Sequence, residues 1–243
     1  MYKNKKILAI IPARGGSKGI PFKNIKIFYG KPLIAWSILS ALKSKIDRVI
    51  VTTDNPQIAK IAKKYGAEVP FLRPSYLAAD SVACEPVIQH VIDWLKDNEN
   101  YNPDGVALLL PTNPLRRSEH INQAIKMFTD RNLDYVVSVA ESTANYNPYW
   151  MLKKLPNNKV VMFNGQPLNR MKAQRQLLPV FYFKNDIIHL FKPSNLQKTP
   201  PSLCGDKTEL YIMDDSFTGD INTMEEWYVT LDKFKRLKNY EKI

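Results

Sequence analysis

A glycine-rich, basic segment at residues 10–24 carries the residue types best suited to holding an anionic ligand. It reads Ile-Ile-Pro-Ala-Arg-Gly-Gly-Ser-Lys-Gly-Ile-Pro-Phe-Lys-Asn. Three glycines within five positions allow the backbone to bend closely around a ligand, and the N–H groups of such a loop can converge on an anion. Arg14, Lys18 and Lys23 add positive charge to the same loop. The segment therefore predicts a polyphosphate site, most simply for a nucleotide, whereas an ordinary surface turn would not need three basic residues.

Two familiar nucleotide-binding patterns are absent from the sequence. A Walker A loop needs Gly-Lys followed by Ser or Thr at the start of a helix, whereas Gly30 and Lys31 precede Pro32. The Gly-x-Gly-x-x-Gly fingerprint of dinucleotide-binding proteins does not occur either. The sequence therefore supports neither a P-loop hydrolase nor a nicotinamide-dependent enzyme.

Cysteine and histidine offer little further chemistry. Cys84 and Cys204 are the only cysteines, too few for a disulfide framework or a four-thiolate metal site. We expect Cys84 to be a small buried thiol and His90 to belong to the packed face of a helix. No order or spacing indicates a Ser-His-Asp or Cys-His arrangement.

Alternating apolar segments predict the framework that positions the basic loop. Short aliphatic runs, typical of strands buried on both faces, lie at residues 7–11, 48–52, 106–110 and 135–139. Apolar residues at helical spacing occur in ranges 55–65, 87–95 and 121–128, the last behind a predicted cap at Ser118. This alternation over residues 5–140 predicts an α/β fold, with a mostly parallel sheet and helices on both faces. The basic loop then lies at the carboxyl end of the first strand, where open α/β sheets bind ligands.

The pattern changes after Ser142. Residues 145–176 are rich in Asn, Pro and aromatic residues, and we interpret them as a small arm or lid with a hairpin around Pro156-Asn157-Asn158. Two late strands are predicted at residues 181–183 and 210–213. Thr223 and Glu226 have the spacing of a capping box for a final helix.

Composition limits the class of protein. The chain has 243 residues, 44% of them hydrophobic and 24% charged, which is ordinary for a globular protein. Its net charge is +12, but the lysines are dispersed without a basic–aromatic repeat, so we expect no nucleic-acid partner. No apolar run is long enough to span a bilayer, and the N-terminal segment lacks a cleavage site, so we expect neither a membrane partner nor a signal peptide. We expect a cytoplasmic protein.

Further motifs follow the basic loop along the whole chain, and together they carry a family resemblance. They are Arg73-Pro74, Leu77-Ala78-Ala79-Asp80, Pro111-Thr112-Asn113-Pro114-Leu115-Arg116, Arg175-Gln176-x-Leu178-Pro179 and Gly219-Asp220-Ile221-Asn222-Thr223. In this order they resemble the CMP-sialic acid (acylneuraminate) cytidylyltransferases, the CMP-nonulosonate synthetases. The resemblance implies a single Rossmann-like nucleotidyltransferase domain over residues 1–243. It also implies a homodimer in which the arm at 145–176 completes the sugar pocket of the partner.

The resemblance also implies residue roles. Arg14, Lys23 and Asp220 match the residues that act in catalysis. The positions that match nucleotide-binding residues are Ala13, Arg14, Gly15, Ser17, Lys23, Asn24, Arg73 and Asp80. Those that match the sugar site are Arg175, Gln176, Tyr182 and Asn185. Asp220 and Asn222 fall on the metal motif, and the implied cofactor is Mg²⁺, which prefers oxygen ligands.

The expected reaction is the transfer of CMP from CTP to the anomeric hydroxyl of a nine-carbon α-keto acid sugar. The sugar would be of the sialic, legionaminic or pseudaminic acid type, and pyrophosphate would leave. Such a transfer requires no covalent enzyme intermediate, so catalysis would depend on positioning the substrates and neutralising phosphate charge.

Four positions depart from the family pattern. Asn222 stands where a second metal carboxylate is usual, and Leu110 where a sugar-binding glutamine is frequent. Asp186 and His189 replace a glycine and a tyrosine. Two alternatives therefore stay open: transfer of CMP to a different acid, such as a Kdo-like sugar or a phosphonate, and a non-catalytic paralogue that binds a nucleotide. A nucleic-acid binder, suggested by charge alone, is the remaining class.

Overall fold

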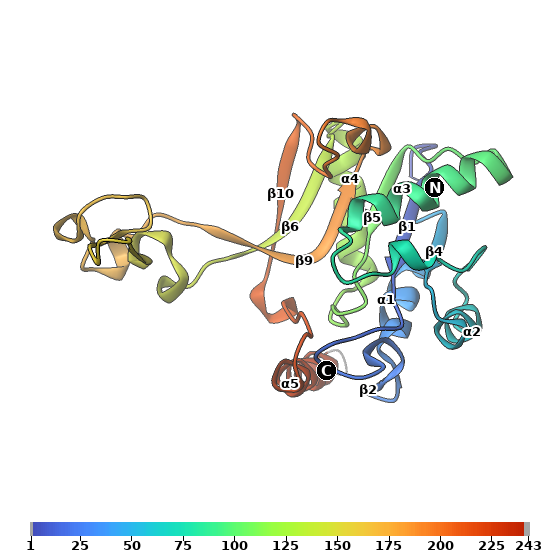
Figure 1. Ribbon diagram of the computed structural model, residues 1–243, viewed down its shortest axis with the longest axis horizontal. Coiled ribbons are helices and arrows are strands. Elements are labelled where there is room, and N and C mark those ends of the chain that lie inside the picture. The colour runs from blue at the N-terminus through green and yellow to red at the C-terminus, as the bar shows by residue number, and fades with distance from the viewer. Residues whose placement is uncertain (1, 241–243) are drawn as a thin grey trace.

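The aliphatic segments form a six-stranded sheet in the computed structural model, which describes residues 2–240 (Figure 1). The strands are β1 Ile7–Pro12, β4 Arg48–Thr52, β5 Gly105–Leu108, β6 Tyr135–Glu141, β9 Tyr182–Phe191 and β10 Thr208–Met213. Their order across the sheet is β10-β6-β9-β5-β1-β4. Strand β9 is antiparallel to both of its neighbours, and the other pairs are parallel. The predicted mostly parallel α/β sheet is confirmed.

Helices cover both faces of this sheet, because successive side chains of each strand point to opposite faces. Helices α1 Leu33–Leu42, α2 Pro56–Lys64 and α4 Ser118–Asp130 pack against one face, which includes Ile7, Ala9 and Ile11 of β1. Helix α3 Cys84–Glu99 packs against the other, with Leu8 and Ile10. Asn55 caps α2, its side chain accepting the N–H groups of Gln57 and Ile58.

The C-terminal helix builds a separate small core. Helix α5 Met224–Tyr240 packs against Phe28, which belongs to the short hairpin of β2 Ile27–Phe28 and β3 Lys31–Pro32. The rings of Phe28 and Trp227 meet edge to face with centroids 5.3 Å apart. The predicted capping box is confirmed: Glu226 N–H donates to Thr223 Oγ1 (3.2 Å), and Thr223 N–H donates to the Glu226 carboxylate (3.0 Å).

Residues 142–181 extend away from the sheet as an arm (Figure 1). Its only regular strands are β7 Leu152–Lys154 and β8 Val160–Met162, which form the predicted hairpin around residues 156–158. The remaining arm residues form short 3-10 turns and loops. The chain returns to the body through β9, whose first residues leave the arm as an extended stem.

Two sequence predictions need correction. Ser118 is the first residue of α4 and not its cap: Arg117 precedes the helix, and its N–H donates to the His120 ring (3.3 Å), a role that the sequence did not assign to histidine. The strand predicted at residues 181–183 continues to Phe191, because the apolar residues that follow pair with β5 and β6. Within residues 2–240, no helix combines the length and the apolar character that a membrane span requires.

Candidate active site

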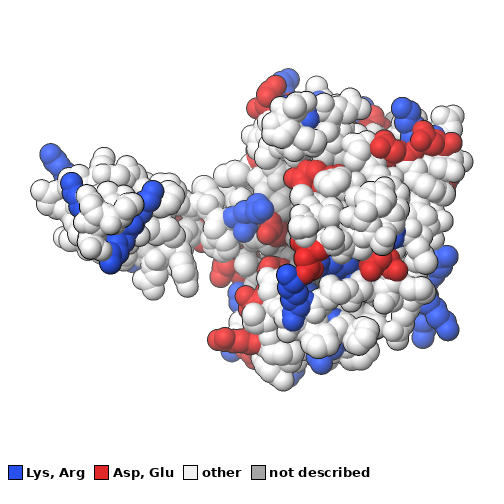
Figure 2. Space-filling view, viewed as in Figure 1, with Lys and Arg blue, Asp and Glu red and all other residues white. Residues whose placement is uncertain are grey.

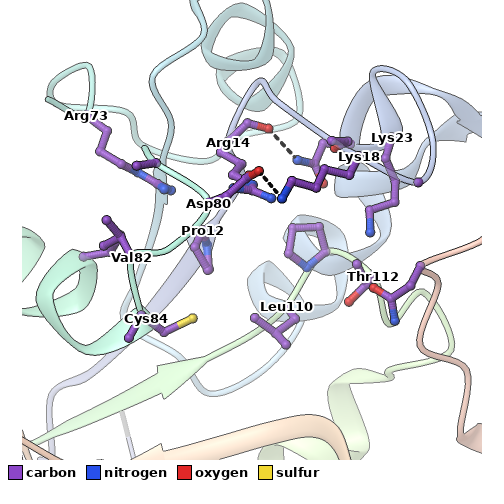
Figure 3. A pocket seen from close by; sticks show the side chains of 18 of the residues that line it. Pro12, Arg14, Lys18, Lys23, Arg73, Asp80, Val82, Cys84, Leu110 and Thr112 are labelled. Atoms are coloured by element: carbon purple, nitrogen blue, oxygen red, sulfur yellow. Dashed lines mark hydrogen bonds and ion pairs between the residues drawn. The ribbon is translucent and has the colours of Figure 1, made fainter. Parts of the chain in front are cut away.

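A cavity of about 550 Å³ opens at the carboxyl ends of β1 and β5. Four segments far apart in the sequence form its walls (Figure 3). They are the basic loop after β1, residues 73–87 leading into α3, residues 110–112 after β5, and the turn with Asp220 and Asn222 before α5. The sheet thus brings these four segments to one edge, as expected for a parallel α/β fold.

The basic loop presents its cations to this cavity. Arg14 forms an ion pair with one oxygen of Asp80, and Lys18 Nζ lies 2.7 Å from the other (Figure 3). The hydrogen bond from Lys18, supported by Arg14, lowers the pKa of the Asp80 carboxyl below its ordinary value. Asn24 is buried, and its side-chain amide donates to the Arg14 carbonyl (3.0 Å), which fixes the backbone of the loop at Arg14. A triphosphate in the cavity would meet the two cations that Asp80 now engages.

Glycine is required where the loop meets the last turn. A Cβ on Gly19 would lie 2.1 Å from the backbone oxygen of Asn222, closer than any side chain can approach. Ala13 is buried, and the N–H of Gly15 donates to Asp54 (2.8 Å), so these two residues shape the loop. Ser17 lines the cavity.

Lys23 links the basic loop to the turn before α5. Its Nζ donates to the Ile221 carbonyl at 2.8 Å. Burial lowers the pKa of the Lys23 ammonium, while the nearby carboxylates of Asp220 and Glu226 oppose this shift. The ammonium is therefore held in place before any ligand binds.

Asp220 and Asn222 lie beside each other at the cavity wall. The Asn222 amide donates to Asp220 Oδ2 at 2.6 Å. Within residues 2–240, no three His, Cys, Asp or Glu side chains cluster as a metal site. Mg²⁺ commonly uses only one or two carboxylates and completes its shell with water and substrate phosphates. An oxygen-donor pair beside a phosphate-binding loop therefore fits Mg²⁺.

Arg73 is buried at another wall of the cavity. Its Nε donates to Thr52 Oγ1 (3.2 Å) and its Nη2 to the Thr52 carbonyl. Burial lowers the pKa of the guanidinium, and the nearby Asp54 opposes the shift. The side chain is fixed by the end of β4, so it is preorganised as the predicted contact to a nucleotide base.

The predicted sugar-site residues are not brought to this cavity. Arg175 and Gln176 are exposed on the arm, and Tyr182 is 39% exposed at the start of β9. Asn185 is buried and accepts the N–H of Ile187 (3.4 Å). None of the four lines the cavity of its own chain.

Cys84 differs from the expectation of a buried thiol. It is exposed at the cavity wall, where α3 begins. The residue as a whole is exposed, but neighbouring side chains shield its thiol partly from water, and this partial burial raises the pKa of the thiol, so it is not activated as a nucleophile.

Arg116 is a positioning residue that sequence reasoning missed. Its buried guanidinium donates to the Ile187 carbonyl (2.6 Å), to Ser37 Oγ (2.8 Å) and to the Leu110 carbonyl (2.8 Å). Burial lowers the pKa of Arg116 to about 9, so the group remains a cation at neutral pH. These bonds tie the cavity residue Leu110 to β9 and α1. The motif at residues 111–116 marked the segment without indicating this cross-link.

Comparisons with known proteins agree with these features. A family described as cytidylyltransferase matches residues 8–189. The chain is 34% identical over 239 residues to N-acylneuraminate cytidylyltransferase of Escherichia coli, covering 98% of this chain and 54% of that protein. It is 35% identical over 218 residues to CMP-N,N'-diacetyllegionaminic acid synthase of Campylobacter jejuni, covering 89% of this chain and 90% of that protein.

A solved structure shares the fold. It is CMP:2-keto-3-deoxy-manno-octonic acid synthetase complexed with CTP, with a TM-score of 0.65 and 17% identity, covering 97% of this chain and 99% of the other. At this identity the likeness concerns the fold alone.

Proposed function

Because the chain belongs to the cytidylyltransferase family, we propose that it transfers CMP from CTP to the anomeric hydroxyl of a nine-carbon α-keto acid sugar. The acid is of the sialic, legionaminic or pseudaminic type, and pyrophosphate is the second product. One observation carries this proposal: Arg14, Lys18 and Lys23 converge with Asp220 on a single cavity that can hold a nucleotide. The relatives named for a sialic and a legionaminic acid are about equally similar, so overall identity does not choose the acid.

The chain's own cations supply the phosphate site. Arg14 and Lys18 exchange their contacts with Asp80 for triphosphate oxygens, while Lys23 stays anchored to the Ile221 carbonyl. Positive groups that are already oriented stabilise the charge of the transition state without reorganising. Arg73, fixed by Thr52, is proposed to contact the cytosine.

The chemical step is a displacement at the α-phosphorus. The anomeric oxygen bonds to the α-phosphorus, the bond from that phosphorus to the bridging oxygen of the β-phosphate breaks, and pyrophosphate leaves with the electron pair. The hydroxyl proton passes to solvent water. Asp220 and Asn222 would hold Mg²⁺, which when bound neutralises phosphate charge. Protein groups hold both substrates in line, and no covalent bond to the protein forms.

We further propose a homodimer in which the arm serves the partner's cavity. The sequence from 142 to 181 contains no Asp or Glu and six basic residues: Lys153, Lys154, Lys159, Arg170, Lys172 and Arg175. Figure 2 shows only basic charged side chains on the arm. The arm also exposes apolar residues, among them Tyr146, Phe163 and Val180, each at least 60% exposed. A basic, apolar lobe far from its own cavity is suited to covering an acidic substrate bound by a second copy.

An acceptor of a different class is the second candidate. Leu110 lines the cavity, and Asp186 and His189 lie nearby in β9, so the departures from the family pattern fall on the acceptor side. These residues favour testing Kdo-like acids as well. A non-catalytic paralogue is motivated only by Asn222. We place the reaction in the cytoplasm, where CTP is formed.

The test is pyrophosphate release from CTP with Mg²⁺. Sialic, legionaminic and pseudaminic acids and Kdo serve as acceptors, with ATP, GTP and UTP as nucleotide controls. We expect turnover with CTP and one nine-carbon acid. Turnover only with Kdo would select the second candidate, and CTP binding without any turnover would support the paralogue. A protein that does not bind CTP would contradict all three.

A further inference from the structure

A network of polar side chains on β9, joined by Tyr135 of β6, lies next to the cavity. His189 is buried between the Tyr135 hydroxyl, 2.6 Å from its Nδ1, and Asp186 Oδ1, 2.9 Å from its Nε2. Lys184 Nζ approaches the same Asp186 oxygen at 3.1 Å. The side chain of Asp186 remains 29% exposed, so its carboxylate is held by two partners and still reachable.

The pKa shifts and the hydrogen bonds show where the protons lie in this network of Tyr135, His189 and Asp186. Although burial acts in the opposite direction, hydrogen bonds from His189 and Lys184 lower the pKa of Asp186, so its carboxylate only accepts hydrogen bonds. Burial raises the pKa of Tyr135, so its hydroxyl keeps a proton to donate. A His189 tautomer with its proton on Nε2 satisfies both neighbours. The hydrogen bonds thus run in one direction, from the Tyr135 hydroxyl to His189 and from His189 to the Asp186 carboxylate.

The backbone at Asp186 is shaped to present this carboxylate. The register between β6 and β9 shifts: Val137 pairs with His189, whereas Val139 pairs with Lys184. In the resulting bulge Asp186 has φ of +53°, a conformation that favours glycine, and Ser138 Oγ accepts the N–H groups of Ile187 and Ile188. A bulge and a strained residue next to an active site typically serve to turn a functional side chain towards the site.

Several contacts place Asp186 beside the cavity. The Asn113 amide donates to the Asp186 carbonyl (3.1 Å), and Asn113 closes the turn that begins at the cavity residue Leu110. Asp186 and Lys184 also act electrostatically on Cys84, another cavity residue. Cys84 and Leu110 lie on the side of the cavity away from Lys18 (Figure 3).

Two buried groups near Asp186 lack partners among the described residues. They are the Oδ1 atom of Asn113 and the Nδ2 atom of Asn185, in side chains that are 1% and 3% exposed. Unsatisfied buried polar atoms are costly, and they concentrate where a ligand or water completes the network. The basic loop lines the opposite side of the cavity, so the side near Cys84 and Leu110 is available for the acceptor sugar.

We propose that Asp186 is a specificity-determining residue whose carboxylate accepts a hydrogen bond from a donor group of the acceptor sugar, a hydroxyl or an acylamino N–H. The inference rests on the proposed function. His189 and Tyr135 are positioning residues that orient the carboxylate. In this role the carboxylate favours acids that present a donor at this point, and it disfavours acids that present an anionic group.

The test compares Asp186→Asn and Asp186→Gly with wild type on every acid of the panel that wild type turns over. We expect the acceptor KM to rise at least tenfold in both variants, with the CTP KM unchanged within twofold. Asp186→Gly relieves the positive φ but leaves the Nε2–H of the buried His189 without its acceptor, so the two effects oppose each other and its Tm should stay close to that of wild type. Tyr135→Phe removes only the far hydroxyl and should raise the acceptor KM about threefold, again without an effect on CTP.

Asp206→Asn is the matched control, because the Asp206 side chain is 97% exposed and its one ion pair within residues 2–240 is with Lys198 at 3.6 Å. An unchanged acceptor KM in both Asp186 variants would overturn the inference, as would a parallel rise in the CTP KM. A loss confined to acids with two acylamino groups identifies an N–H donor, and a loss common to all acids identifies a hydroxyl. If wild type is inactive with every acid, the proposed function fails instead.

Discussion

The three cations of the basic loop differ in how firmly the protein holds them. The Lys18 side chain is 78% exposed and contacts Asp80, whereas Lys23 is half-buried and donates to the Ile221 carbonyl. Arg14 is intermediate, with a side chain that is 33% exposed. Cations that are already oriented contribute most to transition-state stabilisation, because they need no rearrangement during the reaction. We therefore expect Arg14 and Lys23 to matter more than Lys18.

Arg14→Ala and Lys23→Ala should each lower kcat at least tenfold, equivalent to about 1.4 kcal/mol. Each removes a positive charge facing the cavity without opening the main core, so the protein should stay folded. Pyrophosphate release measures the rate, and circular dichroism with thermal melting reports the fold. Lys64→Ala, on an exposed part of α2, is the control for loss of a lysine. Full activity in either loop variant would show that the phosphate site is assigned wrongly.

Asn222→Asp tests the metal pair. The substitution replaces a hydrogen bond to Asp220 with a second carboxylate, so the two acids repel each other without a cation. We expect Tm without Mg²⁺ to fall, the gain in Tm on adding Mg²⁺ to grow, and half-maximal activity to need several-fold less Mg²⁺. Magnesium titrations of activity and melting measure both effects. An unchanged magnesium requirement would argue against a metal at this position.

At the scale of elements, the start of α4 contains a pH-sensitive group. Burial, assisted by Arg117, lowers the pKa of His120 to about 4, while its ring accepts the Arg117 N–H. The unfolded chain takes up a proton near pH 6.5, and the folded protein does so only near pH 4. The contribution of neutral His120 is therefore complete above pH 6.5 and is lost as the pH falls towards 4.

His120→Gln should remove this dependence while keeping an acceptor at the third helical position. Between pH 7 and pH 5, wild type should lose about 1–2 kcal/mol more unfolding free energy than the variant. Urea denaturation at the two pH values measures the difference, and the many carboxylates common to both proteins cancel. Equal losses would mean that His120 titrates normally in the folded protein.

At the scale of the whole molecule, the arm is the feature that a single chain does not explain. It holds Arg175 and Gln176 away from the cavity. Its apolar residues are exposed to water in a single chain, so they contribute no hydrophobic stabilisation there. In a symmetric dimer each arm would meet the other chain's cavity, so every active site would draw on two chains.

Mixing two inactive variants tests this arrangement. Arg14→Ala disables the cavity and Arg175→Ala disables the arm, so a mixed dimer would contain one intact site. We expect mixing after subunit exchange to restore about a quarter of wild-type activity, the statistical share of such sites in exchanging dimers. Sedimentation measures the oligomeric state in parallel. A monomer, or a mixture no more active than its components, would contradict the shared site.

Much of the fold followed from local pattern. Aliphatic runs and helical periodicity predicted β1, β4, β5 and β6 and helices α2, α3 and α4, because burial on one or both faces imposes those periods. The short segment at 181–183 hid the full length of β9, since an antiparallel strand inserted between β5 and β6 has no local signature.

The sequence by itself determined the chemistry of the basic loop and the family, because glycine, charge and motif order are properties of the chain. Only the tertiary structure decided which distant residues meet. Lys23 reaches the Ile221 carbonyl, Arg116 joins Leu110 to Ile187, and Asp186 receives His189 beside the cavity. These contacts depend on strand order, register and one bulge. Long-range pairing sets those features, and residue type and spacing do not encode it.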